Sequence, residues 1–193
     1  MISRLTGQEI TAEEFADMPE SEHAELVRGQ IVEEPVNNWS HARVVTHVAF
    51  ILQWITLKLR LGAVYTGDPG MILDRDPDTT RAPDIAFVQT SHLHLVPPSG
   101  FSEVIADMVV EVVSPNDSAA RVEAKIEEFL EAGVRLAWLL DPRSETLIEF
   151  FGGARRVLRG DDRVSGHDVL PGFGIVVRQL LDVDHFPDMM TQP

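Results

Sequence analysis

The chain of 193 residues contains no cysteine, which excludes disulfide bonds, thiolate zinc sites and thiol catalysis. Lysine is scarce too, since only Lys58 and Lys125 occur among the 16 basic residues. The sequence has neither a glycine-rich phosphate loop nor the Gly-x-Ser-x-Gly elbow of serine hydrolases. Metal sites built from oxygen ligands remain open to this composition.

The chain also has few basic residues relative to acidic ones, 16 against 31, and its formal net charge is −15. This balance argues against broad non-specific attraction to nucleic acid, which normally uses a basic surface. The first residues, "MISRLTGQEITAEEF", have no apolar core of signal-peptide length, and longer apolar stretches are interrupted by charges short of a membrane span. We expect a soluble cytoplasmic protein with no membrane partner.

The first third of the sequence predicts a helix, a β-hairpin and a second, longer helix. In "TAEEFADM", Thr11 and Glu14 form a capping-box pattern that predicts a short helix. The stretch "HAELVRGQIVEEP" alternates around an Arg-Gly turn and predicts the hairpin. From Ser40 to Leu61 the apolar residues recur at helical spacing, with Gly62 as the stop.

The remaining sequence predicts a mixed β-sheet. "AVYTG", "GMILD" and "PDIAFV" are strand-like pieces that resemble a meander. "DMVVEVVS", a helix capped by Asp117 or Ser118 and ending near Gly133, and "VRLAWLLDP" form a crossover that makes its two strands parallel. "VLPGFGIVVRQLLDV" predicts a closing strand and a short helix. Without repeats or a linker, residues 1–193 are expected to form one α/β or α+β domain.

The most apolar strand, "DMVVEVVSPND", carries Glu111 in its middle. An unpaired carboxylate buried there would lose its hydration or shift its pKa, so something must compensate it. Glu111 lies three residues before Ser114, roughly 10 Å along the strand. Lys125 lies about eight residues into the following helix, roughly 12 Å back along its axis. The lysine therefore returns to about the level of Glu111.

A second carboxylate, Asp84 in "RAPDIAFV", begins an apolar strand after a proline. With Glu111 it would supply two hard oxygen donors for Mg²⁺, and the backbone carbonyl of Val112 could complete the protein's share of the shell. The Lys125 ammonium would orient a water or stabilise charge on a phosphoryl group.

Each of these candidate site residues also has an interpretation in which it serves the fold and not a reaction. Glu111 could form an ion pair with Lys125 or Arg121 that serves the fold alone. Lys125 could be an exposed helix lysine, and Asp84 an ordinary turn residue. His41, near the start of the long helix, could equally face the site or lie in solvent beside the cap.

The order of "ELVRG", "RAPDIAFV", "DMVVEVVSPND" and "RVEAKIEEFLEAGVRLAWLLDP" resembles the Uma2 family, restriction-endonuclease-like proteins of the PD-(D/E)XK nuclease superfamily. The resemblance runs from about Thr11 to the closing "LPGFGI". It implies a restriction-endonuclease-like fold, a four-stranded mixed core flanked by helices. It also implies metal-dependent phosphodiester cleavage with Asp84 and Glu111 as ligands.

The resemblance has one departure and two further matches. The superfamily usually carries a lysine two residues after the glutamate, where this chain has Val113. Lys125 matches the family's lysine on the following helix, and Glu25 in "AELVRG" matches its early "EL" before a turn glycine. The resemblance thus implies that Glu25 lies near the site.

The leading hypothesis is an endonuclease that uses Mg²⁺ or Mn²⁺ to cleave DNA and, as the resemblance implies, works as a homodimer. Asp84 and Glu111 hold the metal, Lys125 positions or activates water, and Glu25 holds a second ion or tunes the first. One alternative is a catalytically silent nuclease fold that serves in binding or assembly. Another is a metal hydrolase of a small phosphodiester.

Overall fold

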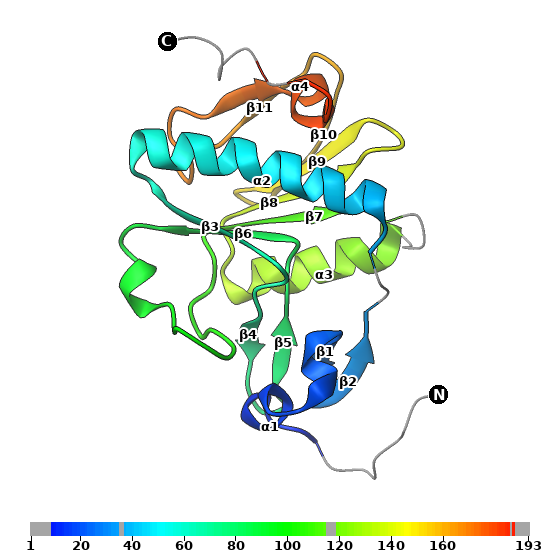
Figure 1. The fold of residues 1–193 in the computed structure, drawn as a ribbon, viewed down its shortest axis with the longest axis vertical. Coiled ribbons are helices and arrows are strands. Elements are labelled where there is room, and N and C mark those ends of the chain that lie inside the picture. Colours follow the sequence, from blue (N-terminus) through cyan, green and yellow to red (C-terminus); the bar gives the residue numbers. More distant parts are fainter. Residues whose placement is uncertain (1–8, 35–36, 115–118, 186, 188–193) are drawn as a thin grey trace.

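A computed structural model of the protein describes residues 9–34, 37–114, 119–185 and 187, and Figure 1 shows its fold. Six strands form the main sheet in the order β10-β9-β8-β7-β6-β3. Only the β7–β8 pair is parallel. The strands are β3 (Gly62–Thr66), β6 (Ile85–Gln89), β7 (Met108–Val112), β8 (Leu136–Asp141), β9 (Thr146–Phe151) and β10 (Ala154–Arg159).

Two helices cover the main sheet, α2 (Trp39–Leu59) on one face and α3 (Ala119–Ala132) on the other (Figure 1). Because side chains alternate along a strand, β7 contributes to both layers. Val110 and Val112 pack in the core under α2, whereas Val109 packs in the core under α3. Glu111 therefore faces α3, the helix that carries Lys125.

A smaller sheet of four strands, in the order β2-β1-β5-β4, lies beside the main one (Figure 1). The expected capping box of Thr11 and Glu14 is present in the short helix beside this sheet. The expected hairpin turns at Arg28 and Gly29, both with positive φ, as tight hairpin turns require. The strands of the small sheet are β1 (Ala24–Val27), β2 (Gln30–Glu33), β4 (Met71–Asp74) and β5 (Thr79–Arg81). The helices that precede it in the chain are α1 (Ala12–Ala16) and η1 (Pro19–Glu22).

The remaining elements are one short 3-10 helix after β6 and the strands and helix at the C-terminal end. The predicted closing strand and helix are β12 and α4, and β12 pairs with β11 in a separate two-stranded sheet. The predicted caps of α3, Asp117 and Ser118, lie outside the described residues. The elements are η2 (Leu93–Leu95), β11 (Arg163–Ser165), β12 (Gly174–Val176) and α4 (Val177–Leu181).

The crossover prediction is confirmed, since α3 joins the parallel strands β7 and β8. The meander prediction is wrong. β3 pairs directly with β6, while β4 leaves the main sheet and pairs with β5. Alternating apolar residues specify a strand but not its neighbour, so the pattern could not distinguish the two sheets.

The long helix ends earlier than predicted. Its last helical residue is Leu59, and Arg60 takes the left-handed conformation at the C-cap. Gly62 is the first residue of β3 instead of the helix stop. The main sheet also has six strands where the resemblance implied four, because β9 and β10 extend it beyond β8.

Within the described part of the chain, α2 is the one helix with the length and hydropathy of a membrane span. One side of it is fully buried on the main sheet through Val48, Ile51 and Leu52. These contacts identify α2 as a core helix of the fold. A third of the residues in its most apolar window are buried inside the fold.

Candidate active site

Asp84 and Glu111 lie opposite each other on neighbouring strands. β6 and β7 pair in antiparallel register with Ile85 against Val110, which places Asp84, just before β6, across from Glu111. Side chains at such opposed positions share a face of the sheet. Both carboxylates are buried, with 8% and 6% of their residue surface exposed. The sheet thus brings two acidic groups together where water is scarce.

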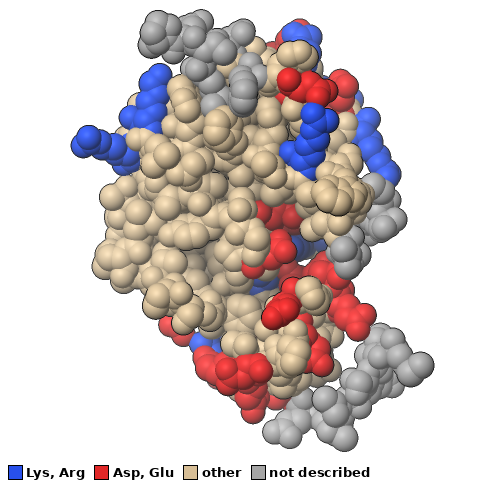
Figure 2. Space-filling view, in the orientation of Figure 1, with Lys and Arg blue, Asp and Glu red and all other residues tan. Residues whose placement is uncertain are grey.

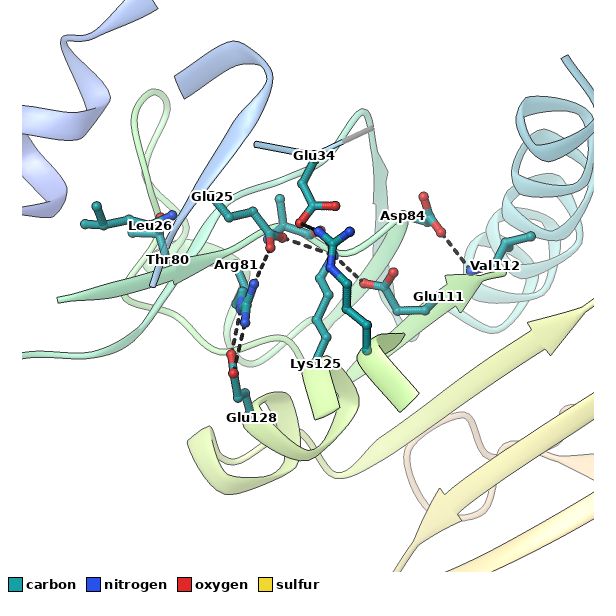
Figure 3. Close-up of polar contacts among 12 residues, drawn as sticks. Glu25, Leu26, Glu34, Thr80, Arg81, Asp84, Glu111, Val112, Lys125 and Glu128 are labelled. Carbon is teal, nitrogen blue, oxygen red and sulfur yellow. Dashed lines mark hydrogen bonds and ion pairs between the residues drawn. The ribbon is translucent and has the colours of Figure 1, made fainter. Parts of the chain in front are cut away.

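Lys125 reaches Glu111 from α3, as the register estimate predicted (Figure 3). Its Nζ lies 2.9 Å from Glu111 Oε1 and 3.0 Å from Glu25 Oε1, and it donates a hydrogen bond of 2.7 Å to the Ala82 carbonyl. Three acceptors match the three protons of an ammonium group. The exposed-lysine interpretation is therefore wrong. Arg121, the other suggested partner of Glu111, pairs with Glu34.

The pKa values in this cluster follow from burial and charge. Burial raises the pKa of Glu111 to about 8, which Lys125 opposes and the nearby Asp84 carboxylate reinforces. Burial lowers the pKa of Lys125, but the charges of Glu111 and Glu25 outweigh it, and the pKa lies above its ordinary value. Lys125 therefore stays an ammonium ion. It can stabilise negative charge, but it is a poor acceptor of a proton.

Glu25 is held in place by two groups besides Lys125. Its Oε2 accepts a 2.6 Å hydrogen bond from Arg81 Nη1, and its Oε1 accepts one of 2.9 Å from the Ala82 backbone N–H. Burial raises the pKa of Glu25, but the charges of Lys125 and Arg81 outweigh this effect and lower it. Glu25 is thus an ionised, fixed partner for the lysine.

Sequence reasoning missed Arg81 and Glu128. Arg81 also binds Glu128 of α3 through two hydrogen bonds, Nε to Oε2 at 2.6 Å and Nη2 to Oε1 at 2.9 Å (Figure 3). It therefore connects β1 of the small sheet to the helix that carries Lys125. The available signal was spacing, since Glu128 lies one helical turn after Lys125 and Arg81 lies three residues before Asp84.

Asp84 is oriented through one of its oxygens. Its Oδ2 accepts a 2.7 Å hydrogen bond from the Val112 backbone N–H and lies 3.2 Å from His41 Nε2. His41 is buried, so the interpretation of a solvated cap neighbour is wrong. Among the described residues, no side chain or backbone group bonds Oδ1. The metal-binding role of the Val112 carbonyl stays a prediction.

These residues line a cleft of about 640 Å³ between the two sheets. Burial, followed by the neighbouring carboxylate, raises the pKa of Glu34 beside Glu25 and of Asp68 beside Asp84. Acidic side chains gather at the mouth of this hollow (Figure 2). The cleft lining includes two cations, Arg81 and Lys125, and six carboxylates, those of Glu22, Glu25, Glu34, Asp68, Asp84 and Glu111.

Among the described residues, no three His, Asp or Glu side chains form a ready-made metal cluster. The donor set nevertheless fits Mg²⁺ or Mn²⁺. Mg²⁺ commonly uses one or two carboxylates and keeps waters or substrate phosphates as its other ligands. Asp84 and Glu111 are two such carboxylates, and burial raises the pKa of Glu111 even with Lys125 beside it. A divalent cation would supply the missing charge.

Comparisons with known proteins agree with this fold. The sequence model of the Uma2 family, described as "Putative restriction endonuclease", matches residues 12–182. The crystal structure of "a putative nuclease belonging to DUF820" from Anabaena variabilis ATCC 29413 superposes with a TM-score of 0.77. The two chains are 20% identical, and the match covers 90% of this chain and 98% of that one. No protein of curated function matches the sequence.

Proposed function

Because the chain belongs to the Uma2 family of restriction-endonuclease-like proteins, we propose that it is a divalent-metal-dependent endonuclease that hydrolyses phosphodiester bonds of DNA. One observation carries this proposal. The buried carboxylates Asp84 and Glu111 lie opposite each other, and the ammonium of Lys125 lies 2.9 Å from Glu111. Two oxygen donors and a fixed cation are the groups that phosphoryl transfer needs.

Each residue has a definite part in this proposal. Asp84 and Glu111, with the Val112 carbonyl, would hold Mg²⁺ or Mn²⁺. The metal, when bound, supplies Lewis-acid stabilisation of phosphate charge and lowers the pKa of a coordinated water. Lys125 remains charged and stabilises the negative charge that develops on the phosphoryl oxygens. Because α3 brings it level with Glu111, it replaces the strand lysine whose position Val113 occupies.

Glu25 has a positioning part. It is tied to Arg81 and to the Ala82 backbone, and it holds Lys125 at 3.0 Å. Since its own pKa is lowered, it stays ionised and keeps the lysine charged. Glu25 would therefore hold the lysine in place while Glu111 coordinates a metal ion.

The test is the nicking of supercoiled plasmid in Mn²⁺ by wild type, Asp84→Ala and the matched control Asp17→Ala, with EDTA as a further control. Asp17 is an exposed aspartate outside the cleft. Wild type and Asp17→Ala should nick. Asp84→Ala should lose about 100-fold or more of the rate, because a metal contributes several kcal/mol to the transition state. Undiminished nicking by a folded Asp84→Ala protein would exclude this site.

A second candidate is a catalytically silent fold for binding or assembly, or a hydrolase of a small phosphodiester. The observation that favours it is the excess of six carboxylates over two cations in the cleft, both cations being held by the protein's own carboxylates. Mn²⁺ titration by thermal shift, together with a chromogenic phosphodiester, distinguishes these options. Hydrolysis of the small ester alone supports the second class of enzyme. If Mn²⁺ causes no thermal shift and neither substrate is cleaved, the result supports the silent fold.

A further inference from the structure

A groove of about 520 Å³ lies between α2 and β3, beside the acidic cleft. The groove and the cleft share five lining residues, namely Asn37, His41, Gly67, Asp68 and Asp84. The groove therefore begins at Asp84, the first of the two proposed metal ligands. A strand with a phosphate bound at Asp84 would place its neighbouring nucleotide at the opening of the groove.

The walls of the groove come from one ridge of α2 and one face of β3. Four residues of α2 line it at intervals of four, namely His41, Val45, Ala49 and Gln53. Residues at this interval form a ridge along a helix. The ridge extends about 18 Å from His41 at a rise of about 1.5 Å per residue. On the other wall, Val64 and Thr66 are two apart on β3 and so share a face.

The chemistry of the groove differs from that of the cleft. Beyond the shared end, the described residues that line the groove include no charged side chain. Val45, Ala49 and Val64 supply aliphatic contacts, whereas Gln53 supplies an amide and Thr66 a hydroxyl. A phosphate has no cation to bind there. A nucleobase fits better, because it has an apolar face and an edge of donors and acceptors, which a glutamine amide can bond through both its atoms.

The charge of the cleft favours a single strand over a duplex. Six carboxylates and two cations line the cleft, and the net charge of the chain is −15. A duplex carries one phosphate charge per about 1.7 Å of its axis and a single strand one per about 3.4 Å, so the acidic cleft repels a duplex more strongly. A duplex also keeps its bases paired and stacked, and turning one out costs free energy that an unpaired base does not require.

We propose that the groove between α2 and β3 binds an unpaired nucleobase next to the phosphate at Asp84, and that the substrate is single-stranded DNA or an unpaired segment of a duplex. This inference rests on the proposed function, because it requires a phosphodiester at Asp84 and Glu111. Gln53 and Thr66 would bond the edge of the base, and Ala49 would contact its face. Nicking of supercoiled plasmid agrees with this substrate, since negative supercoiling favours strand separation.

The first test measures binding separately from cleavage. Fluorescence polarisation with Ca²⁺ in place of Mn²⁺ compares a short labelled single strand of mixed sequence with a hairpin duplex of the same sequence. Wild type should bind the single strand more tightly by about 10-fold or more, because the duplex must unpair a base to fill the groove.

Two substitutions test the groove itself. Ala49→Leu fills it with an aliphatic side chain and should weaken binding of the single strand by about 10-fold, since the base loses its stacking contact. Gln53→Ala removes the amide and should weaken binding by about fivefold. Ala120→Leu and Gln30→Ala are matched controls, because both residues are exposed and lie outside the groove and the cleft. Both controls should bind like wild type, and circular dichroism must show that all four variants are folded.

The second test compares cleavage rates in Mn²⁺ on a circular single strand, a supercoiled plasmid and the same plasmid relaxed. The first two should be cut faster than the relaxed plasmid by about 10-fold or more. Equal rates on all three substrates, equal binding of single strand and duplex, no binding of the single strand, or full binding by both groove variants would each overturn the inference. Groove-dependent binding without cleavage of any substrate would instead exclude the nuclease and keep the nucleobase site.

Discussion

Glu111 is buried within a strand, and its charged form loses hydration that the unfolded chain provides. Its pKa rises from an ordinary value of 4.5 to about 8. Between these values the folded protein holds a proton that the unfolded chain releases. The contribution of Glu111 to the free energy of unfolding therefore falls as pH rises through this interval, by at most about 1.4 kcal/mol per pH unit.

We predict that Glu111→Gln gains stability relative to wild type as pH rises from 5 to 8 in metal-free buffer, because glutamine has no proton to release. Urea titrations at several pH values measure the difference. Glu131→Gln is the control, since Glu131 is exposed on α3, the helix that carries Lys125. Its difference from wild type should stay constant. A constant difference for Glu111→Gln as well would show that Lys125 fully compensates the carboxylate.

Lys125 is the cation on which Glu111 depends. Lys125→Met should lower the free energy of unfolding by about 3 kcal/mol, because it removes one partner of a buried ion pair. Mn²⁺ should then raise the Tm of the variant more than that of wild type, since a bound metal replaces the lost charge and no ammonium repels it. The only other lysine provides the control. Lys58→Met should change stability by no more than about 0.5 kcal/mol.

The pairing of β3 with β6 depends on a close backbone approach at Gly62. A Cβ at this position would lie 2.0 Å from the Val88 carbonyl oxygen and 2.9 Å from Gln89 Cα. Gly62→Ala should therefore push the edge strand away and cost about 3 kcal/mol of stability, measured by urea unfolding. Gly100→Ala is a matched control, because Gly100 has positive φ but open space around its Cβ position. It should cost about 1 kcal/mol. Similar costs for both would assign the effect to backbone conformation.

Local spacing was enough to predict the elements that carry the site. The helical rise and the strand rise placed Lys125 level with Glu111, and the crossover rule made β7 and β8 parallel. The sequence did not predict how β3, β4 and β6 pair, because β4 and β6 carry similar patterns of apolar residues. Only tertiary contacts separate these two strands into different sheets. Arg81 was missed for a related reason. Its partners Glu25 and Glu128 are 56 and 47 residues away in sequence.

Under the proposed function, the charge of the whole molecule limits how it would bind DNA. The net charge is −15, and both cations of the cleft are already bound to the protein's own carboxylates. Few phosphates can be neutralised by lysine or arginine at the candidate site. In the proposed function divalent metal would therefore supply much of the attraction, and DNA binding should be weak in its absence.

This charge distribution leads to a prediction about salt. Binding of a labelled DNA duplex in Ca²⁺ is measured by fluorescence polarisation, with wild type and with Asp17→Ala as its control. For both proteins log Kd should depend only slightly on log salt, with a slope of about 1 to 2, because each neutralised phosphate contributes nearly one unit. EDTA should abolish most of the binding. A slope of about 6 that persists in EDTA would instead reveal a basic footprint outside the cleft. The exposed arginines of β10 are the residues to test in that case, since Arg156→Ala would then reduce the slope by about one unit.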